Sequence, residues 1–418
     1  MKNVLLISPY FLPSNLAAVH RVRLMSGHLA SFGWHPIIIT VDSSLYEERP
    51  AVPELLHLVP SSVEIVSVRA FPASLCRPLG IGDISLRAQA SLRRTVAELV
   101  EKLTPAVIFV TVLPGYASLI GAWAKRRFNI PFVLDYQDPW VPRGPKPPLE
   151  WTKAGMSKRL ARWLEPQVLP FVDAITAVSD ETLASLRERK LLSAATPVEI
   201  IPIGADVADF AIARQFGRSS IDPRTGGFHV AYLGTITHRM RPALEAFLQA
   251  VRTVRDSETK SILIHLIGTF EPDMKGLVEQ MGLHSCVRVT PTRISYLDAL
   301  CSMEDADLLL LLGSTDSHYT ASKLFPYWLS GKPIMAIFHE ASEVVPLSRE
   351  LGGVHLSLFN SQNNPAMNID QIASVLRRAM KGELTMPARR ENAFVQYSAK
   401  SVAKRYAEIF TKVSTRSA

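Results

Sequence analysis

The chain lacks several patterns that mark common classes of protein. It has only three cysteines among 418 residues, Cys76, Cys286 and Cys301. Their wide spacing forms neither a zinc motif nor a disulfide framework, and it fits a reducing cytosol best, so we predict a cytoplasmic protein. The most apolar stretch, residues 308–312, is far too short to span a bilayer, and residues 4–7 are too short for the core of a secretory signal.

Two binding motifs are also missing. The loop after the first apolar run contains no G-x-G-x-x-G sequence, which disfavours a dinucleotide site. No recognised nucleic-acid module or aromatic platform appears, so nucleic acid is the least expected partner. The net charge of +8 is instead compatible with a sugar-nucleotide diphosphate, a phospholipid surface or ordinary surface bias.

The sequence does contain a regular alternation of short apolar runs and amphipathic stretches. Strands are predicted at residues 4–7, 37–41, 63–68, 107–111, 132–134, 174–178 and 198–201, and again at 229–233, 262–267, 287–289, 308–311 and 334–337. Such alternation indicates βαβ units around parallel sheets. We predict an α/β fold of two Rossmann-like, doubly wound domains, residues 1–203 and 204–393, followed by a helical segment, 394–418. Residues 204–227, which lack a clear strand, mark the boundary zone.

Candidate binding residues of the first half follow its strands. Ser14, Asn15 and Ala17 precede a helix whose N-terminus would expose backbone N–H groups to an anion, although a plain strand-to-helix turn is the alternative. Asp138 follows a buried strand and is our candidate for an acceptor hydroxyl, although Asp before proline is also a common turn choice. Asp135 has the same two interpretations.

In the second half, Gly234 and Thr235 end a predicted strand, and Gly234 permits close backbone approach. Arg239 and Arg241 follow. Each can grip phosphate oxygens through two donors, or else lie at a solvated helix start. Arg293, in the loop after residues 287–289, is a further candidate donor contact.

The sharpest pattern begins at Ser322, Lys323 and Leu324. These residues are expected at the N-terminus of a short helix, predicted over residues 321–330 and ended by Gly331. A diphosphate placed there would meet backbone N–H groups and a lysine. A lysine in a first turn opposes the helix dipole, which favours an anionic ligand.

Together these stretches resemble the GT-B glycosyltransferases, and among them the large retaining group called family 4. The resemblance is carried by Pro13-Ser14-Asn15-Leu16-Ala17-Ala18, by residues 134–140, 177–179 and 201–206, by Tyr232-Leu233-Gly234-Thr235, by residues 306–308, and by Ser322-Lys323-Leu324-Phe325 through Gly331-Lys332-Pro333. It implies a GT-B fold in which the two domains face a central cleft and the C-terminal helix crosses back to the first domain.

The resemblance also implies an activity. A hexosyl or related transferase would move a sugar from a nucleotide-diphosphate sugar, bound mainly by the second domain, to an acceptor hydroxyl bound mainly by the first. It implies retention of anomeric configuration, no cofactor beyond the donor co-substrate, and no metal. The acceptor would be a saccharide or a lipid-linked molecule, as in cell-envelope polysaccharide biosynthesis. Arg239 and Lys323 are the candidates for stabilising the leaving diphosphate.

One departure from the family leaves alternatives open. Many members carry two glutamates eight residues apart, where this chain has His318 and Pro326. His318 remains a candidate contact for the donor sugar, or an exposed loop residue, whereas Pro326 has no side-chain hydrogen bond to offer the ribose. An epimerase acting on nucleotide sugars and a non-catalytic binding subunit are therefore the competing interpretations. His20 is either near the acceptor or structural.

Residues 143–163 combine six lysines and arginines with Trp151, Met156, Leu160 and Trp163, and Glu150 is their only acidic residue. Cations beside tryptophan suit an anionic lipid surface. The alternative is a loop and a helix that pack the aromatic residues inward. Peripheral contact with an anionic membrane, at the inner membrane surface, is thus a hypothesis from the sequence.

Overall fold

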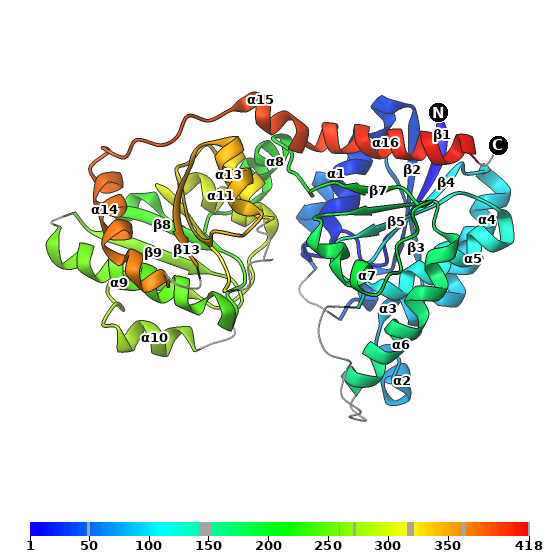
Figure 1. Ribbon diagram of the computed structural model, residues 1–418, viewed down its shortest axis with the longest axis horizontal. Helices are drawn as coiled ribbons and strands as arrows, with labels where there is room; N and C mark the ends of the chain where they lie inside the picture. Colours follow the sequence, from blue (N-terminus) through cyan, green and yellow to red (C-terminus); the bar gives the residue numbers. More distant parts are fainter. Residues whose placement is uncertain are drawn as a thin grey trace. The chain divides into compact units, whose positions relative to one another are not determined.

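The computed structural model describes residues 1–47, 51–141, 153–258, 260–270, 273–315, 322–360 and 364–416. Contacts between Cα atoms divide the chain into two compact units: unit 1, residues 1–204 and 399–418, and unit 2, residues 205–398. Each unit is built on one parallel sheet with helices on both faces (Figure 1). The prediction of an α/β fold with two Rossmann-like domains is confirmed.

The sheet of unit 1 has seven strands in the order β3-β2-β1-β4-β5-β6-β7. They span β1 (Lys2–Ile7), β2 (Trp34–Val41), β3 (Glu64–Val68), β4 (Val107–Thr111), β5 (Phe132–Tyr136), β6 (Ala174–Ala177) and β7 (Val198–Ile200). The helices are α1 (Val19–Leu29), α2 (Ala73–Cys76), α3 (Ile84–Arg87), α4 (Gln89–Leu103), α5 (Ser118–Phe128), α6 (Lys153–Val168), α7 (Ala184–Glu188) and α16 (Ala399–Arg416). The central strands are apolar on both faces because helices cover both.

The C-terminal helix α16 belongs to unit 1, where it packs beside α1. Its aromatic residues Tyr406 and Phe410 lie edge-on against Phe109 of β4 at centroid distances of 5.4 and 5.9 Å. This confirms that the last helix returns to the first domain. Burial of these large rings contributes on the order of 2–3 kcal/mol each, so α16 is part of the core of unit 1.

The sheet of unit 2 has six strands in the order β10-β9-β8-β11-β12-β13. They span β8 (Phe228–Leu233), β9 (Ile262–Ile267), β10 (Val287–Thr290), β11 (Leu308–Leu312), β12 (Ile334–His339) and β13 (Val354–Phe359). The helices are α8 (Ala208–Phe216), α9 (Arg241–Ser257), α10 (Met274–Gln280), α11 (Tyr296–Asp305), α12 (Leu324–Leu329), α13 (Val344–Leu351), α14 (Ile369–Met380) and α15 (Glu391–Phe394).

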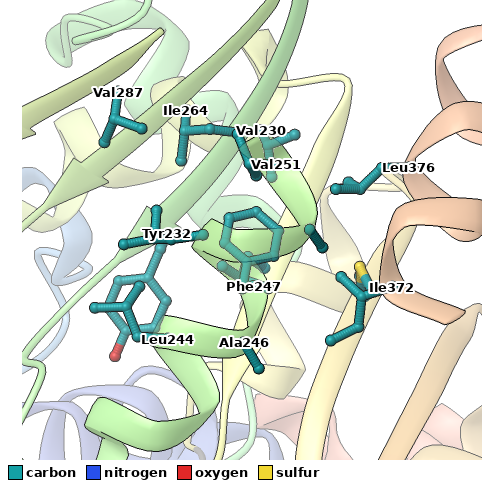
Figure 2. Packing of buried hydrophobic residues seen from close by; sticks show 14 of the residues in the cluster. Val230, Tyr232, Leu244, Ala246, Phe247, Val251, Ile264, Val287, Ile372 and Leu376 are labelled. Atoms are coloured by element: carbon teal, nitrogen blue, oxygen red, sulfur yellow. The ribbon is translucent and has the colours of Figure 1, made fainter. Parts of the chain in front are cut away.

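One face of this sheet packs against α9 and α14 (Figure 2). Phe247 of α9 is fully buried in this cluster, together with Val230 of β8, Ile264 of β9 and Leu376 of α14. The apolar residues of α9 recur at helical spacing, which gives the helix one continuous apolar stripe. This packing holds the start of α9, and the loop before it, against the carboxyl end of β8.

Two parts of the fold differ from the sequence-based expectation. Strand β13 was not predicted, because Val354–Phe359 is the edge strand of the sheet, half of its residues are only partly buried, and it has no continuous apolar run. Residues 204–227 contain helix α8, where Phe210 and Ala213 are buried and the carboxylate of Asp209 accepts a hydrogen bond from Tyr296 at 3.0 Å. Among the described residues, no helix is long and apolar enough to cross a membrane.

Candidate functional site

In unit 2 the strand order reverses between β8 and β11. Strands β9 and β10 lie on one side of this pair, and β12 and β13 lie on the other. Open parallel sheets bind ligands beyond the carboxyl ends of the strands at such a point. The loops that leave β8 and β11 are tied together here, because the Thr315 N–H donates to the carbonyl oxygen of Arg239 at 2.9 Å. Most of the donor candidates lie on this edge.

Lys323 lies over the glycine that ends β8. A Cβ atom on Gly234 would stand 2.0 Å from Cε and 2.4 Å from Nζ of Lys323, and Gly234 has a φ of +146°. A Cβ on Gly268, at the end of β9, would stand 2.0 Å from the Gly234 carbonyl oxygen. The two glycines therefore allow the strand ends and the lysine to approach closely, and no larger residue fits at position 234 without moving the lysine.

The amine of Lys323 is held by an aromatic ring and by no carboxylate. Its Nζ lies 5.4 Å from the centroid of the buried Tyr232 ring, at cation–π distance. Among the described residues no acidic side chain pairs with it. Nearby, the Tyr327 hydroxyl of α12 accepts the N–H of Leu233 at 2.9 Å, and the Tyr232 hydroxyl donates to the Thr235 carbonyl at 2.7 Å. The first bond holds α12, which Lys323 directly precedes, against the end of β8, and the second stabilises the loop after β8.

The three candidate arginines differ in their surroundings. Arg239 is exposed in the turn η9 (His238–Met240) directly before α9. Arg241 begins α9 and places Nε 2.7 Å from Glu245, one helical turn further on, so its charge already has an acidic neighbour. Arg293 is exposed in the loop after β10. This loop also lies at the carboxyl end of the strands, but two strands away from β8.

The start of α12 agrees in part with the sequence pattern. Lys323 is the residue that precedes the helix and Ser322 is exposed beside it, but the helix is only six residues long, shorter than the span predicted. The Leu324 side chain is fully buried, so only its backbone could contact a ligand. Pro326 is buried within the helix. His318 lies outside the described residues.

In unit 1 the corresponding reversal of strand order lies between β1 and β4. Ser14, in the loop after β1, is buried, and its hydroxyl accepts the N–H of Leu16 at 3.3 Å, so it shapes the loop. Asn15 is half-buried and Ala17 is exposed. Gln137, directly after β5, donates its amide N–H to the carbonyl of Ala18 at 3.0 Å. The structure thus brings the loops after β1 and β5 together.

Asp138 is exposed beside Gln137, but partial desolvation of its carboxyl raises the pKa above the ordinary value. Trp140 stands over Gly115 of the loop after β4, where a Cβ would be 2.3 Å from its ring. It also contacts Tyr116 edge-on at 5.3 Å. Asp138 therefore lies in a wall built from the loops after β1, β4 and β5.

Two polar atoms in this wall have no hydrogen-bond partner among the described residues: Oε1 of Gln137 and Nε1 of Trp140, both buried. Sequence reasoning named Asp138 but neither of these neighbours, although both lie in the same Asp-Tyr-Gln-Asp-Pro-Trp stretch. The signal in the sequence was an amide directly before Asp138 and an indole N–H donor two residues after it.

Asp135 has a structural role. It is fully buried, and its carboxylate receives Arg21 Nε at 3.2 Å, the Thr176 hydroxyl at 2.6 Å and the Tyr406 hydroxyl at 2.8 Å. These contacts join α1, β5, β6 and α16. Burial, the main cause, raises the pKa of Tyr406 well above its ordinary value, so the phenol remains a donor to the carboxylate.

Asp307 also has a structural partner, since its carboxylate accepts the backbone N–H of His229 at 2.8 Å. It precedes β11 at the amino end of the sheet, away from the Gly234 edge. In the described part of the chain no three His, Cys, Asp or Glu side chains are grouped to hold a metal ion.

Comparison with known proteins agrees with this fold. Residues 17–204 match the family model of the Glycosyl transferase 4-like domain. A glycosyltransferase from Rickettsia africae superposes with a TM-score of 0.59 at 14% identity, covering 99% of this chain and 98% of that chain. A UDP-forming α,α-trehalose-phosphate synthase from Burkholderia vietnamiensis gives 0.58 at 12% identity, covering 100% and 99%.

A third structure, a UDP-GlcNAc 2-epimerase from Methanocaldococcus jannaschii, gives a TM-score of 0.52 at 14% identity, covering 98% of this chain and 99% of that chain. No curated protein sequence matches the chain. Identities this low establish the fold and leave the reaction open. The chain has the GT-B fold, and residues 17–204 match the Glycosyl transferase 4-like domain, so the resemblance to the GT-B glycosyltransferases is confirmed.

Proposed function

We propose that the protein is a glycosyltransferase that moves a sugar from a nucleotide-diphosphate sugar, bound by unit 2, to an acceptor hydroxyl bound by unit 1. The single observation that carries the proposal is the amine of Lys323 at the switch point of unit 2, beside Gly234 and without a carboxylate partner among the described residues. A cation held by an aromatic ring over a glycine loop suits a diphosphate.

The leaving diphosphate gains negative charge as its bond to the sugar breaks. Lys323 would neutralise part of that charge, and Arg239, exposed in the loop that Thr315 anchors, would add a second cation. Preorganised cations of this kind favour a metal-independent reaction. Retention of configuration is proposed from the resemblance to family 4 alone.

On unit 1, the free Gln137 oxygen and the carboxyl of Asp138 suit an acceptor hydroxyl. A carboxyl whose pKa is raised by desolvation is a better proton acceptor once ionised than an ordinary surface aspartate. We propose that Asp138 and Gln137 orient the attacking hydroxyl of a saccharide or lipid-linked acceptor, with Ser14, Asn15 and Ala17 shaping the loop beside them.

Pro326 supports a second candidate, a unit 2 that binds nucleotide without transferring sugar. Where many family members place a ribose-binding glutamate, this chain has a buried proline that offers no side-chain hydrogen bond. An epimerase is the other alternative, because one of the structural neighbours is a UDP-GlcNAc 2-epimerase. Both alternatives predict nucleotide binding at Lys323 but no sugar transfer to an acceptor.

The test is a thermal-shift screen of nucleotide sugars, followed by calorimetry with the best donor. Binding at about 100 times the Kd adds about 2.7 kcal/mol of stability. Lys323→Met is expected to weaken binding about 10- to 100-fold, the value of one charge-assisted contact. Lys332→Met is the matched control, because Lys332 precedes β12 and so lies at the amino end of the strands, opposite to the end that carries Lys323.

Equal affinity of both lysine variants for the nucleotide would refute the donor site. Turnover of the donor then separates the functions. A glycosylated acceptor supports the transferase, conversion of the free donor sugar supports the epimerase, and binding without turnover of any tested donor supports the binding subunit.

A further inference from the structure

Unit 1 exposes an apolar helix face. On α6, Met156, Leu160 and Trp163 follow one another at spacings of four and three residues, so they share one side of the helix. They are 41, 39 and 64% exposed, whereas Ala161 and Glu165 on the inner side are almost fully buried. A surface helix ordinarily buries its apolar stripe, so this outer stripe needs a partner.

A groove of about 750 Å³ lies beside this stripe. Met156 and Leu160 of α6 form one wall, and Leu79 and Ile81, in and after the turn η4 (Arg77–Leu79), form the other. Helices α2, α3 and α6 lie close together here (Figure 1). Leu79 is 77% exposed, and the lining is mostly apolar.

A second groove, of about 520 Å³, continues along the same helix between α4, α5 and α6. Leu164, one turn after Leu160, lines it. Arg93, Arg126 and Arg127 also line it, all three exposed, and no acidic side chain does. None of the three arginines pairs with a carboxylate among the described residues. Arg93 and Arg126 instead lie 5.6 and 5.4 Å from the ring centroids of Trp123 and Phe171.

We infer that these two grooves and the Trp163 stripe, together the α6 surface, dock unit 1 on an anionic phospholipid bilayer. Exposed leucine, methionine and tryptophan side chains, next to arginines that pair with no carboxylate in the described part of the chain, match a leaflet that is apolar inside and negative at its surface. The charge complementarity is strong because the Arg-rich groove has no acid of its own.

The same features disfavour other occupants. A second copy of the chain docked through this surface would bring like-charged arginines together, which costs free energy. A nucleic acid would gain from the arginines but not from the aliphatic walls of the first groove, since bases stack on aromatic rings. The inference needs no nucleotide and does not rest on the proposed transferase activity.

The experiment is flotation of the full chain with vesicles of phosphatidylcholine alone or mixed with phosphatidylglycerol, without nucleotide. We expect binding to the mixed vesicles at low salt and weaker binding as salt screens the arginines. The paired substitution Leu79→Asp with Trp163→Asp, and the paired substitution Arg126→Glu with Arg127→Glu, should each lower the partition coefficient at least about tenfold.

Matched controls lie on unit 2. Met367→Asp changes an apolar side chain that is 72% exposed, and Lys275→Glu reverses an exposed charge. Both should leave partitioning unchanged. Because every substituted side chain is exposed, thermal unfolding should be unchanged in all variants, which separates lost docking from lost folding.

The inference is overturned if the unmodified chain remains at the bottom of the gradient at low salt and does not rise with the vesicles. It is also overturned if the α6-surface variants and the unit 2 controls float equally. It is also overturned if the same substitutions convert a dimer to a monomer while the unmodified chain ignores vesicles, which would assign the surface to self-association. Loss of vesicle binding with intact nucleotide binding would support docking and leave the transferase proposal untouched.

Discussion

The two units share one strand order but carry different groups at the point where that order reverses. In unit 1 this edge holds Gln137, Asp138 and Trp140, while the strong charge nearby, Asp135, is buried in a network. In unit 2 the edge holds Lys323, whose charge has no acidic partner in the described residues. We therefore expect the topology to determine where a ligand binds in each unit, and the loops to determine whether the ligand meets an amide and a carboxyl or a cation.

The largest effect should come from breaking the buried network of unit 1. Asp135→Ala would leave the Arg21 guanidinium buried without its carboxylate, which typically costs about 3–5 kcal/mol. We expect that loss in the free energy of unfolding, measured by urea denaturation. Asp180→Ala, which removes an exposed pair with Arg187, should cost about 0–1 kcal/mol.

A double variant sharpens this prediction. Adding Arg21→Met to Asp135→Ala removes the stranded charge, so part of the lost stability should return. A stable Asp135→Ala protein that binds donor but transfers no sugar would contradict the structural role and return Asp135 to the list of catalytic candidates.

Acid should affect the two units in opposite directions. In unit 2, Nδ1 of His229 lies 3.0 Å from Nε2 of the buried His265, and burial, helped by His229 and Arg288, lowers the pKa of His265 to about 4. An unfolded histidine titrates near 6.5, so protons favour the unfolded state. Unit 2 should lose on the order of 2–3 kcal/mol as the pH falls from about 6.5 to about 4.

In unit 1, burial raises the pKa of the Asp83 and Glu165 carboxyls. Protonation of these two carboxyls therefore favours the folded state. Unit 1 gains this stability as the pH falls through their folded-state pKa values. Hydrogen exchange of β8 and β9 amides against β5 amides, at neutral and acidic pH, measures the two units separately. The acid loss in unit 2 should vanish in His265→Gln. Equal protection of both units across this range would contradict the prediction.

At the carboxyl end of β8, Gly234→Ala should cost about 1–3 kcal/mol, because alanine tolerates a φ of +146° poorly. The new methyl group also occupies the position of Lys323 Cε, so the lysine must move and nucleotide affinity should fall with stability. Gly226→Ala is the matched control: its φ is also positive, but a Cβ there meets nothing within 4 Å. Calorimetry should show lower affinity in the first variant alone.

The sequence predicted most of the architecture because the core strands are continuous apolar runs. Leu308–Leu312 and Val107–Thr111 are buried throughout, and such runs are legible without a structure. Strand β13 escaped because half of its residues are only partly buried at a sheet edge. Helix α8 escaped because residues 204–227 as a whole are rich in Asp, Arg, Gly and Ser, and because Tyr296, which donates to the buried Asp209, lies 87 residues away.

The candidate site was predictable as a set of residues and not as a geometry. Lys323 and Gly234 were each named from local pattern, yet their contact joins residues far apart in the chain. The same holds for Asp135, whose partners come from α1, β6 and α16. Arg241 differs, because its partner Glu245 lies only one helical turn away in the sequence. Gln137 and Trp140 stand out only once the fold shows that their polar atoms are buried and unmatched.

The smallest effect is expected at Arg241. Its side chain is 45% exposed and its Nε lies 2.7 Å from Oε1 of Glu245, an arrangement worth only about 0.3–0.5 kcal/mol on a helix surface. Arg241→Ala should therefore change stability little and nucleotide affinity by less than about threefold, because a cation with an acidic neighbour attracts a diphosphate weakly. Lys323→Met, measured by the same calorimetry, should have the larger effect, because the amine of Lys323 has no acidic partner among the described residues. If Arg241→Ala weakened nucleotide binding as much as Lys323→Met, an acidic neighbour would not determine how strongly a cation of unit 2 attracts the diphosphate. The contrast between Lys323 and Arg241 would then be one of position alone.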